Sequence, residues 1–310
     1  MGIPTDFHSL YLLILGRALT KDIQKLKFVN MRNAAGYLIA ILILWGSGAG
    51  AQELRIPEPS TSQRIDQEFG LGRITITYSR PNTKGRKILG IIEPYGHVWR
   101  TGANAATKVK LTDSLQIEGH WLAPGEYALF TIPGADEWTV IFNKTADQWG
   151  AYSYDSTKDA LRFTIKAGKQ DLRLETFTIQ FANMVTEHGE LQLLWENTIV
   201  SLRLETNVDA RVMANIEQAM KGEKKPYYRA AIYYYNHQKD LHMALAWMKE
   251  WDKIQPDQYN IKYWLAKIEL KLGDKAAAIA SANAGLKLAM QEPNAEYIRM
   301  NKEILADAGN

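Results

Sequence analysis

The stretch "RITITYSR", residues 73–80, shows the pattern that decides the first half of the fold. Ile74, Ile76 and Tyr78 alternate with threonine and serine, so every second residue is apolar. Successive side chains of a strand point to opposite faces, and one-sided alternation is therefore typical of an antiparallel strand with one buried face. The same alternation recurs at residues 138–142, 177–181 and 200–204.

Turn-forming dipeptides separate these short apolar runs. They are Pro81-Asn82, Lys84-Gly85, Pro124-Gly125 and His188-Gly189. Many short strands joined by such turns favour a β-sandwich or a jelly-roll-like antiparallel domain over a parallel sheet. We expect roughly eight to ten strands within residues 52–207.

The apolar period changes after Asn207. Apolar residues then recur at helical spacing, as in Leu241, Ala244, Leu245 and Met248. That spacing places one apolar stripe on a helix. Asp240 and Ala244 also recur as Asp274 and Ala278, about 34 residues later, and a period of 34 in helical sequence resembles the tetratricopeptide repeat.

Residues 208–310 are therefore predicted to form an all-α, tetratricopeptide-like domain. The repeat is incomplete, because two degenerate copies are fewer than the three or so that a free-standing stack needs. Helices near 208–221 and 294–307 are candidate caps of the array. A helical bundle packed on the sheet domain stays open as the alternative.

The N-terminus has the order of a secretory signal peptide. Basic residues are followed by the apolar run "GYLIAILILW", residues 36–45, and by Ala49-Gly50-Ala51. The run is shorter than the roughly 20 residues that a membrane span requires. We therefore expect residues 1–51 to be a leader that is removed, which leaves no stable membrane anchor and places the protein in the periplasm or outside the cell.

The composition limits the classes of function. The chain has no cysteine, so disulfides and thiolate metal sites do not arise. Removing the five basic and two acidic residues of the leader from the chain's 37 basic and 34 acidic residues leaves equal numbers of each. The mature chain is therefore neutral by formal charge, and nothing in its charge points to nucleic acid.

Catalytic and cofactor motifs are absent from the sequence. It contains no G-x-S-x-G elbow, no H-E-x-x-H helix, no phosphate-binding P-loop and no strand-linked G-x-G-x-x-G fingerprint. His97, His120 and Glu126 do not form the set of three or four converging ligands that a metal usually needs. We predict neither a metal nor a cofactor.

Two loops could hold a ligand. "SRPNTKGRK", residues 79–87, gathers Arg80, Lys84 and Arg86, and guanidinium groups match carboxylate or phosphate oxygens. The alternative for this loop is a solvated turn. "DQWGAYSYD", residues 147–155, includes Trp149, and aromatic rings there can either stack on sugar rings or close the end of the sandwich.

The stretch "GHVWRTGANAAT", residues 96–107, raises a similar choice. In a turn, Gly102 would supply a positive φ, Asn104 would bridge the turn and Trp99 would anchor it in the core. Arg100 is left over and needs a partner. We expect it either to pair with a carboxylate or to contact a ligand together with Arg80, Arg86 and Asn104.

Four stretches together resemble a known family. They are "YSRPNTKGRKILG", "PYGHVWRTGANAATKV", "LAPGEYALFTIPGADEWTVIFNK" and "ETFTIQF". They resemble the bacterial secreted family called domain of unknown function 2911, over about residues 71–206. The resemblance implies a signal peptide, a β-rich domain and, in some members, a helical repeat tail, but it implies no activity and no catalytic residue.

We therefore expect a non-catalytic ligand-binding or protein-interaction module of the cell envelope. Its partners would be an anionic or glycan ligand and a protein or peptide that docks on the helical tail. The alternative is a hydrolase of envelope glycan or another polymer, which a close pair of acidic side chains in a cleft would favour. The candidate ligand-binding residues are Arg80, Lys84, Arg86, Trp99, Arg100, Asn104, Asn143 and Trp149.

The leader makes a first prediction. The protein purified from its native host should begin at Gln52, because Ala49-Gly50-Ala51 has the small residues that signal peptidase requires. Intact-mass measurement checks this. A cytoplasmic product that retains residues 31–51 would contradict it.

Overall fold

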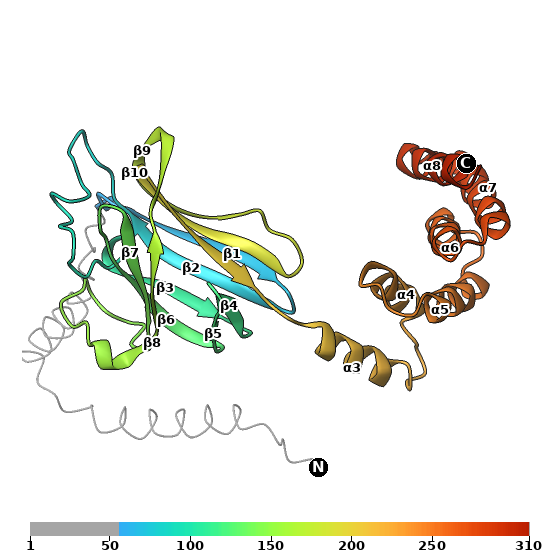
Figure 1. Cartoon of the computed structure of the whole chain (residues 1–310), viewed down its shortest axis with the longest axis horizontal. Coiled ribbons are helices and arrows are strands. Elements are labelled where there is room, and N and C mark those ends of the chain that lie inside the picture. Colours follow the sequence, from blue (N-terminus) through green and yellow to red (C-terminus); the bar gives the residue numbers. More distant parts are fainter. Residues whose placement is uncertain (1–55, 310) are drawn as a thin grey trace, which may run out of the picture. The chain divides into compact units, whose positions relative to one another are not determined.

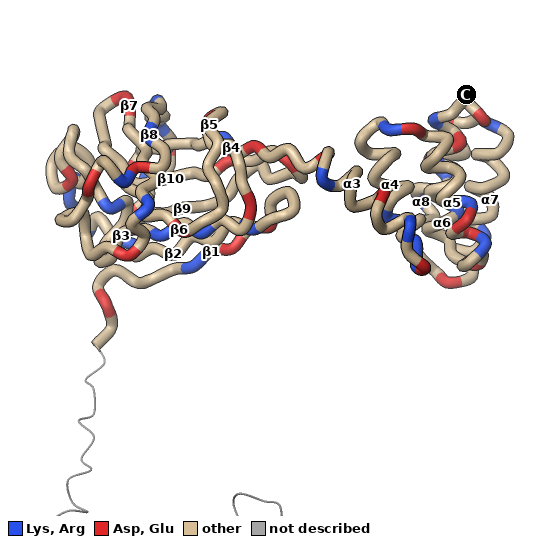
Figure 2. Tube along the Cα trace, turned by 90° about the horizontal axis from the view of Figure 1, so that it is seen from below, with Lys and Arg blue, Asp and Glu red and all other residues tan. Residues whose placement is uncertain are grey.

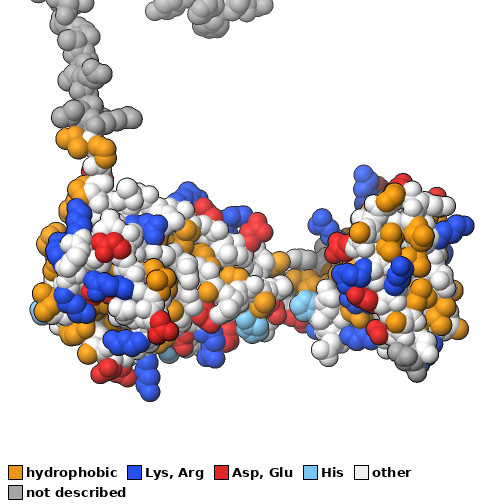
Figure 3. Space-filling model, turned by 90° about the horizontal axis from the view of Figure 1, so that it is seen from above, with side chains coloured by type: hydrophobic (Ala, Val, Ile, Leu, Met, Phe, Trp, Pro, Cys, Tyr) orange, Lys and Arg blue, Asp and Glu red, His pale blue; other side chains and the backbone are white. Residues whose placement is uncertain are grey.

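The computed structural model describes residues 56–309 (Figure 1). The predicted leader, residues 1–51, lies outside the described residues. Within the described residues, no helix has the length and apolar content that a membrane crossing needs. Basic and acidic residues are interspersed along the described chain (Figure 2), and apolar side chains lie scattered among charged ones on the face drawn in Figure 3.

The first half of the chain forms two antiparallel sheets. The six-stranded sheet has the order β1-β2-β3-β6-β7-β8, and the four-stranded sheet has the order β5-β4-β10-β9. The strands are β1 (Thr61–Phe69), β2 (Gly72–Arg80), β3 (Ala103–Leu111), β4 (Leu115–Ile117), β5 (His120–Leu122), β6 (Gly125–Ile132), β7 (Glu137–Asn143), β8 (Asp159–Lys166), β9 (Gly168–Ala182) and β10 (His188–Glu205). The predicted sandwich-like antiparallel domain is confirmed.

The alternating pattern that predicted β2 also fixes its orientation. Ile74, Ile76 and Tyr78 are 4%, 0% and 2% exposed, and they face the second sheet from a strand that pairs with β1 and β3. A shift of register by one residue would turn this apolar face toward water. The burial of every second side chain therefore holds the strand in register.

The strand β10 reverses direction near Glu196. The Thr206 N–H donates to the Glu187 carbonyl over 3.0 Å, although a straight strand of this length would hold these residues about 60 Å apart. Glu196 has a φ of 51°, and the pairing of β10 with β9 shifts register on both sides of it. The element is therefore a hairpin whose tight turn contains Glu196.

An aromatic cluster joins the two sheets. Trp99 stacks on Trp195 of β10, with ring centroids 5.5 Å apart and planes 16° apart. Its edges meet Trp138 of β7 at 6.1 Å and Phe177 of β9 at 5.0 Å. All four rings are at most 3% exposed, so this cluster forms the centre of the core.

The second half of the chain is helical, as predicted. The helices are α3 (Asp209–Ala219), α4 (Tyr227–Asn236), α5 (Leu241–Ile254), α6 (Tyr259–Lys271), α7 (Lys275–Gln291) and α8 (Ala295–Gly309). The Asp240 carboxylate accepts the N–H groups of His242 and Met243 at the start of α5, and Asp274 accepts that of Ala277 at the start of α7. The two repeated aspartates are thus both N-caps, which satisfy backbone donors that the helix cannot.

The two ends of the helical array differ. The helix α8 packs against α6 and α7 and buries Asn301, Ile304 and Ala308, so the candidate cap near 294–307 covers apolar surface. No side chain of α3 is buried. Its apolar residues Val212 and Ile216 are half-buried and line a hollow together with Tyr233 of α4. The cap near 208–221 therefore stays a prediction.

The Glu196 carboxylate holds the loop that follows β2. It is 3% exposed and accepts the N–H of Ile88 at 3.4 Å and that of Leu89 at 3.0 Å. Lys87 and Arg173 each place a cationic nitrogen 3.5 Å from it. Buried backbone donors need such a partner, since leaving one without a hydrogen bond costs roughly 1–3 kcal/mol.

Replacing Glu196 should therefore destabilise the sheet domain. We expect Glu196→Ala to lower the free energy of unfolding by about 3 kcal/mol, because two buried N–H groups lose their acceptor. Urea denaturation measures the change. The matched control is Glu205→Ala, whose exposed ion pair with Arg203 should contribute less than about 1 kcal/mol. Equal losses in the two variants would contradict the prediction.

Candidate functional site

The basic loop after β2 uses its cations to fasten itself. Arg80 donates from Nε to the Phe177 carbonyl over 3.2 Å and from Nη2 to the Thr178 hydroxyl over 2.7 Å, which ties β2 to β9. Arg86 donates from Nε to the Thr83 carbonyl over 2.8 Å. These hydrogen bonds within the protein take up donors that the sequence assigned to an anion.

A carboxylate lies at the centre of the same loop. Glu175 on β9 accepts the Thr83 hydroxyl and the backbone N–H of Lys84, whose own side chain is exposed. These hydrogen bonds, with Arg173 and Arg86 nearby, hold the pKa of Glu175 below its usual value. An anionic ligand at this loop would have to approach the Glu175 carboxylate, which disfavours an anion there.

The turn from Trp99 to Asn104 is built by close backbone contacts. The Trp99 indole donates to the Gly102 carbonyl over 3.1 Å, and the Thr107 hydroxyl donates to the Thr101 carbonyl over 2.6 Å. A Cβ at Gly102 would lie 3.0 Å from the Ser79 carbonyl oxygen. Gly102 is thus required for close approach.

The positive φ expected at Gly102 lies at its neighbours instead. Thr101 has a φ of 53° and Asn104 has a φ of 60°. The Asn104 amide donates to the Ser79 hydroxyl over 3.3 Å, so its side chain ties the turn to β2. Trp99 belongs to the core and is not available to a ligand.

Arg100 keeps a nitrogen without a partner. Its Nε is buried and makes no hydrogen bond within the described residues, and no carboxylate there lies within 4.0 Å of its guanidinium group. The charge of Arg100 influences the carboxyl group of Glu93. Burial raises the pKa of Glu93, and the positive charge of Arg100 opposes that rise. Arg100 therefore shares no hydrogen-bond partner with Arg80 or Arg86 among the described residues.

The loop between β7 and β8 displays two aromatic side chains. Trp149 is 69% exposed and Tyr152 is 85% exposed. The Tyr152 ring lies against Gly150, where it comes within 2.6 Å of the position that a Cβ would occupy. Both rings therefore project from the same turn.

Hydrogen bonds to β3 fix the backbone of this aromatic loop. Ala105 forms an isolated bridge with Trp149, and the Gly150 N–H donates to the Asn104 carbonyl over 3.1 Å. The Ala106 N–H donates to the Gln148 carbonyl over 2.9 Å. The turn that contains Asn104 thus positions Trp149, which links two residues that the sequence only grouped together.

Asn143 fixes the other side of the loop. It is fully buried, and its amide nitrogen donates to the Asp155 carbonyl over 2.9 Å and to the Asp159 carboxylate over 2.8 Å. Its amide oxygen accepts the Thr145 N–H over 3.0 Å. Asn143 is therefore a support for the loop and does not face a ligand.

A tyrosine, an aspartate and an arginine complete the base of the loop. The Tyr154 hydroxyl donates to Asp159 over 2.7 Å and accepts from Arg162 over 2.9 Å. The Tyr154 ring packs edge-on against Phe130, with centroids 5.2 Å apart. Burial and the Asp159 carboxylate raise the pKa of Tyr154 to about 12.

Two glutamates share a hollow of about 330 Å³ on the second sheet. Glu118 and Glu190 line it together with His188, Ser201 and Arg203. Hydrogen bonds from Asn183, Gln192 and Ser201 hold the pKa of Glu190 below its usual value. A glycosidase needs one carboxyl group with a raised pKa as its general acid, so the shift of Glu190 is in the wrong direction for that role.

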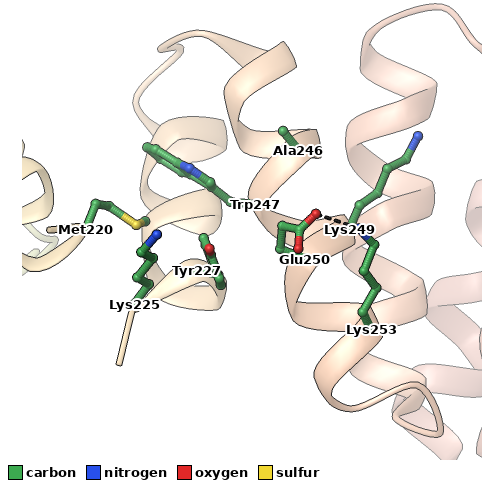
Figure 4. A pocket seen from close by; sticks show the side chains of 8 residues that line it. All are labelled: Met220, Lys225, Tyr227, Ala246, Trp247, Lys249, Glu250 and Lys253. Atoms are coloured by element: carbon green, nitrogen blue, oxygen red, sulfur yellow. Dashed lines mark hydrogen bonds and ion pairs between the residues drawn. The ribbon is translucent and has the colours of Figure 1, made fainter. Parts of the chain in front are cut away.

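The helical half has a hollow of about 460 Å³ beside α4 and α5 (Figure 4). Figure 4 shows Tyr227 and Trp247 near Lys225, with the side chain of Lys249 pointing away from them. Glu250, the carboxylate in the lining, pairs with Lys253 at 2.6 Å. The hollow therefore combines exposed lysines with aromatic surface.

Residues 60–204 match the family model described as "Protein of unknown function (DUF2911)". The sheet domain belongs to this family. The DUF2911 match begins just before β1 and ends within β10, and so contains the aromatic cluster, the Arg100 turn and the aromatic loop. No curated protein and no solved structure matches the chain.

Sequence reasoning missed three residues of the DUF2911 domain that the structure makes prominent. The sequence did not predict that Tyr152 is more exposed than the other tyrosine of its loop, because a loop has no regular spacing of apolar residues from which exposure can be predicted. Glu93 and Glu196 gave no signal, since their partners lie in a turn or across the sandwich. The Gly-containing motif around Trp149 was the one local hint to the exposed rings.

The raised pKa of Tyr154 predicts a pH dependence. Its neutral form is favoured in the folded protein, so the stability that it contributes is complete below pH 10 and is lost as the pH rises toward about 12. The difference in unfolding free energy between the natural protein and Tyr154→Phe should therefore shrink from pH 10 to pH 12. Denaturation at a series of pH values measures it. A difference that stays constant over this range would contradict the assignment.

Proposed function

We propose that the protein is an exported, non-catalytic binding protein whose sheet domain holds a glycan of the cell envelope on Trp149 and Tyr152. One observation carries the proposal: two large aromatic side chains, 69% and 85% exposed, project from a loop whose backbone is fixed. Aromatic residues are the usual anchors of binding sites, and here burial in the core does not account for them.

The rigidity of the loop supports a binding role. Asn143 and Asn104 hold its two sides through the hydrogen bonds described above. A fixed aromatic ring loses little conformational freedom when a ligand arrives, so more of the contact energy appears as affinity. The loop therefore suits a preformed platform.

A sugar ring is the ligand class that fits such a platform. Its apolar C–H face can lie on the ring of an indole or a phenol, whose faces carry partial negative charge. Asp147, two residues before Trp149, forms an ion pair with Lys108, so this charge of the loop is already compensated within the protein. The envelope location rests on the predicted leader.

The rival proposal, a hydrolase, receives less support. Its strongest candidate site is the hollow that contains Glu118 and Glu190, and the lowered pKa of Glu190 does not suit a proton donor. Glu93 has a raised pKa, but within the described residues Arg100 is the one charged group that influences it, and a pair of carboxyl groups is what a glycosidase needs.

The test is binding of soluble peptidoglycan fragments, chitin-type oligosaccharides and an acidic polysaccharide, measured by calorimetry. Trp149→Ala and Tyr152→Ala should each weaken binding at least about tenfold without lowering the melting temperature, because both side chains are exposed. The matched control is Trp121→Ala, which removes a 56% exposed tryptophan from β5. Binding that survives both loop substitutions, or that Trp121→Ala weakens equally, would overturn the proposal.

A further inference from the structure

The inner layer of the helical domain contains a second hollow, of about 360 Å³, that is independent of the sheet domain. The helices α4, α6 and α8 lie in one layer, with α5 and α7 in the other (Figure 1). The hollow crosses all three helices of the first layer, since Tyr235 comes from α4, Lys267 from α6 and Asp307 from α8.

Lys267 is the central cation of this hollow. Its ammonium nitrogen lies 5.3 Å from the ring centroid of Tyr235, 5.5 Å from that of Tyr263 and 4.9 Å from that of Trp264. The residue is half-buried, and no carboxylate lies within 4.0 Å of it among the described residues. Aromatic faces attract a cation, but they do not neutralise its charge.

A second lysine of α6, Lys271, also lines the hollow. The Lys271 ammonium nitrogen lies 4.4 Å from the centroid of Tyr235, and it too has no ion-pair partner within the described part of the chain. Two ammonium groups thus share one tyrosine ring. An anion bound near both would be attracted by each of them.

The hollow also has acidic side chains in its lining, and they come from α8. Glu303 and Asp307 belong to α8, and Glu303 forms an ion pair with Arg299, one helical turn earlier. Leu270, Met300 and Ile304 also line the hollow. Its lining therefore combines two lysines, two carboxylates and apolar surface.

We infer that this hollow binds a peptide segment that presents a carboxylate to Lys267 and Lys271 and a basic side chain to Asp307. The rings of Tyr235, Tyr263 and Trp264 restrict the Lys267 side chain before the ligand arrives. The side chain therefore loses less conformational entropy when the ligand binds. A carboxylate adds charge-assisted hydrogen bonds that the rings cannot provide. The carboxylate is either an acidic side chain or the end of a chain.

The hollow in Figure 4 is a weaker candidate for this partner. Its lysines are exposed, Lys253 is neutralised by Glu250, and Lys249 points away from the aromatic rings. Lys249 is consequently a suitable control position in the same domain.

The test uses the purified protein and two displayed peptide libraries. One library carries its random residues inside a chain with blocked ends, and the other carries them at a free carboxyl end. Enrichment of aspartate and glutamate in the first library assigns the carboxylate to a side chain, whereas enrichment confined to the second assigns it to the chain end. We expect a basic residue to be enriched alongside the carboxylate.

Affinities of a selected peptide then decide the role of the lysines. Lys267→Met should raise the Kd about ten- to a hundredfold, Lys267→Arg should recover most of the affinity, and Lys249→Met should leave it unchanged. If Lys267→Met lowers the melting temperature, Lys271→Met replaces it in the measurement, because Lys271 is exposed, and it should also raise the Kd. The inference would be overturned if the selected peptides carried no charge, or if the Lys267→Met variant selected the same peptides as the natural protein. An unchanged Kd in both the Lys267→Met and the Lys271→Met variants would also overturn it.

Discussion

The face-to-face contact between Trp99 and Trp195 is the interaction on which the sheet domain depends. Trp99 comes from a long connection without regular structure, and its three aromatic neighbours come from β7, β9 and β10. The contact therefore fixes an irregular segment to both sheets at once. The residues that follow, from Arg100 to Asn104, take their positions from this anchor, and the aromatic loop takes its position from Asn104 and Ala105.

Many polar residues of the sheet domain hold the backbone of its loops in place. Most of the cations and amides that suggested a ligand are engaged in holding backbone: Arg80 bonds to β9, Arg86 to its own loop, and Asn143 to the loop after β7. The energy of these hydrogen bonds maintains the conformation of the loops. The side chains of Trp149 and Tyr152, by contrast, are left exposed.

The two halves of the chain offer surfaces of different chemistry. The sheet domain presents exposed rings, which suit an uncharged ring-shaped ligand. The helical domain presents a half-buried ammonium among rings in a hollow that two carboxylates also line, which suits a ligand with charges of both signs. On the two proposals made above, one chain would hold an envelope glycan and a protein segment together.

The sequence by itself determined the features that repeat at short range. The period of two around Ile74 and Ile76 required an antiparallel sheet with one buried face, and Asp240 and Asp274 marked the starts of two equivalent helices. The tertiary structure alone decided which side chains are free. Arg80 finds its acceptor 97 residues away, and Glu196 caps a turn 107 residues before it. Local periodicity carries no information about such contacts, because they depend on how the sheets close over one another.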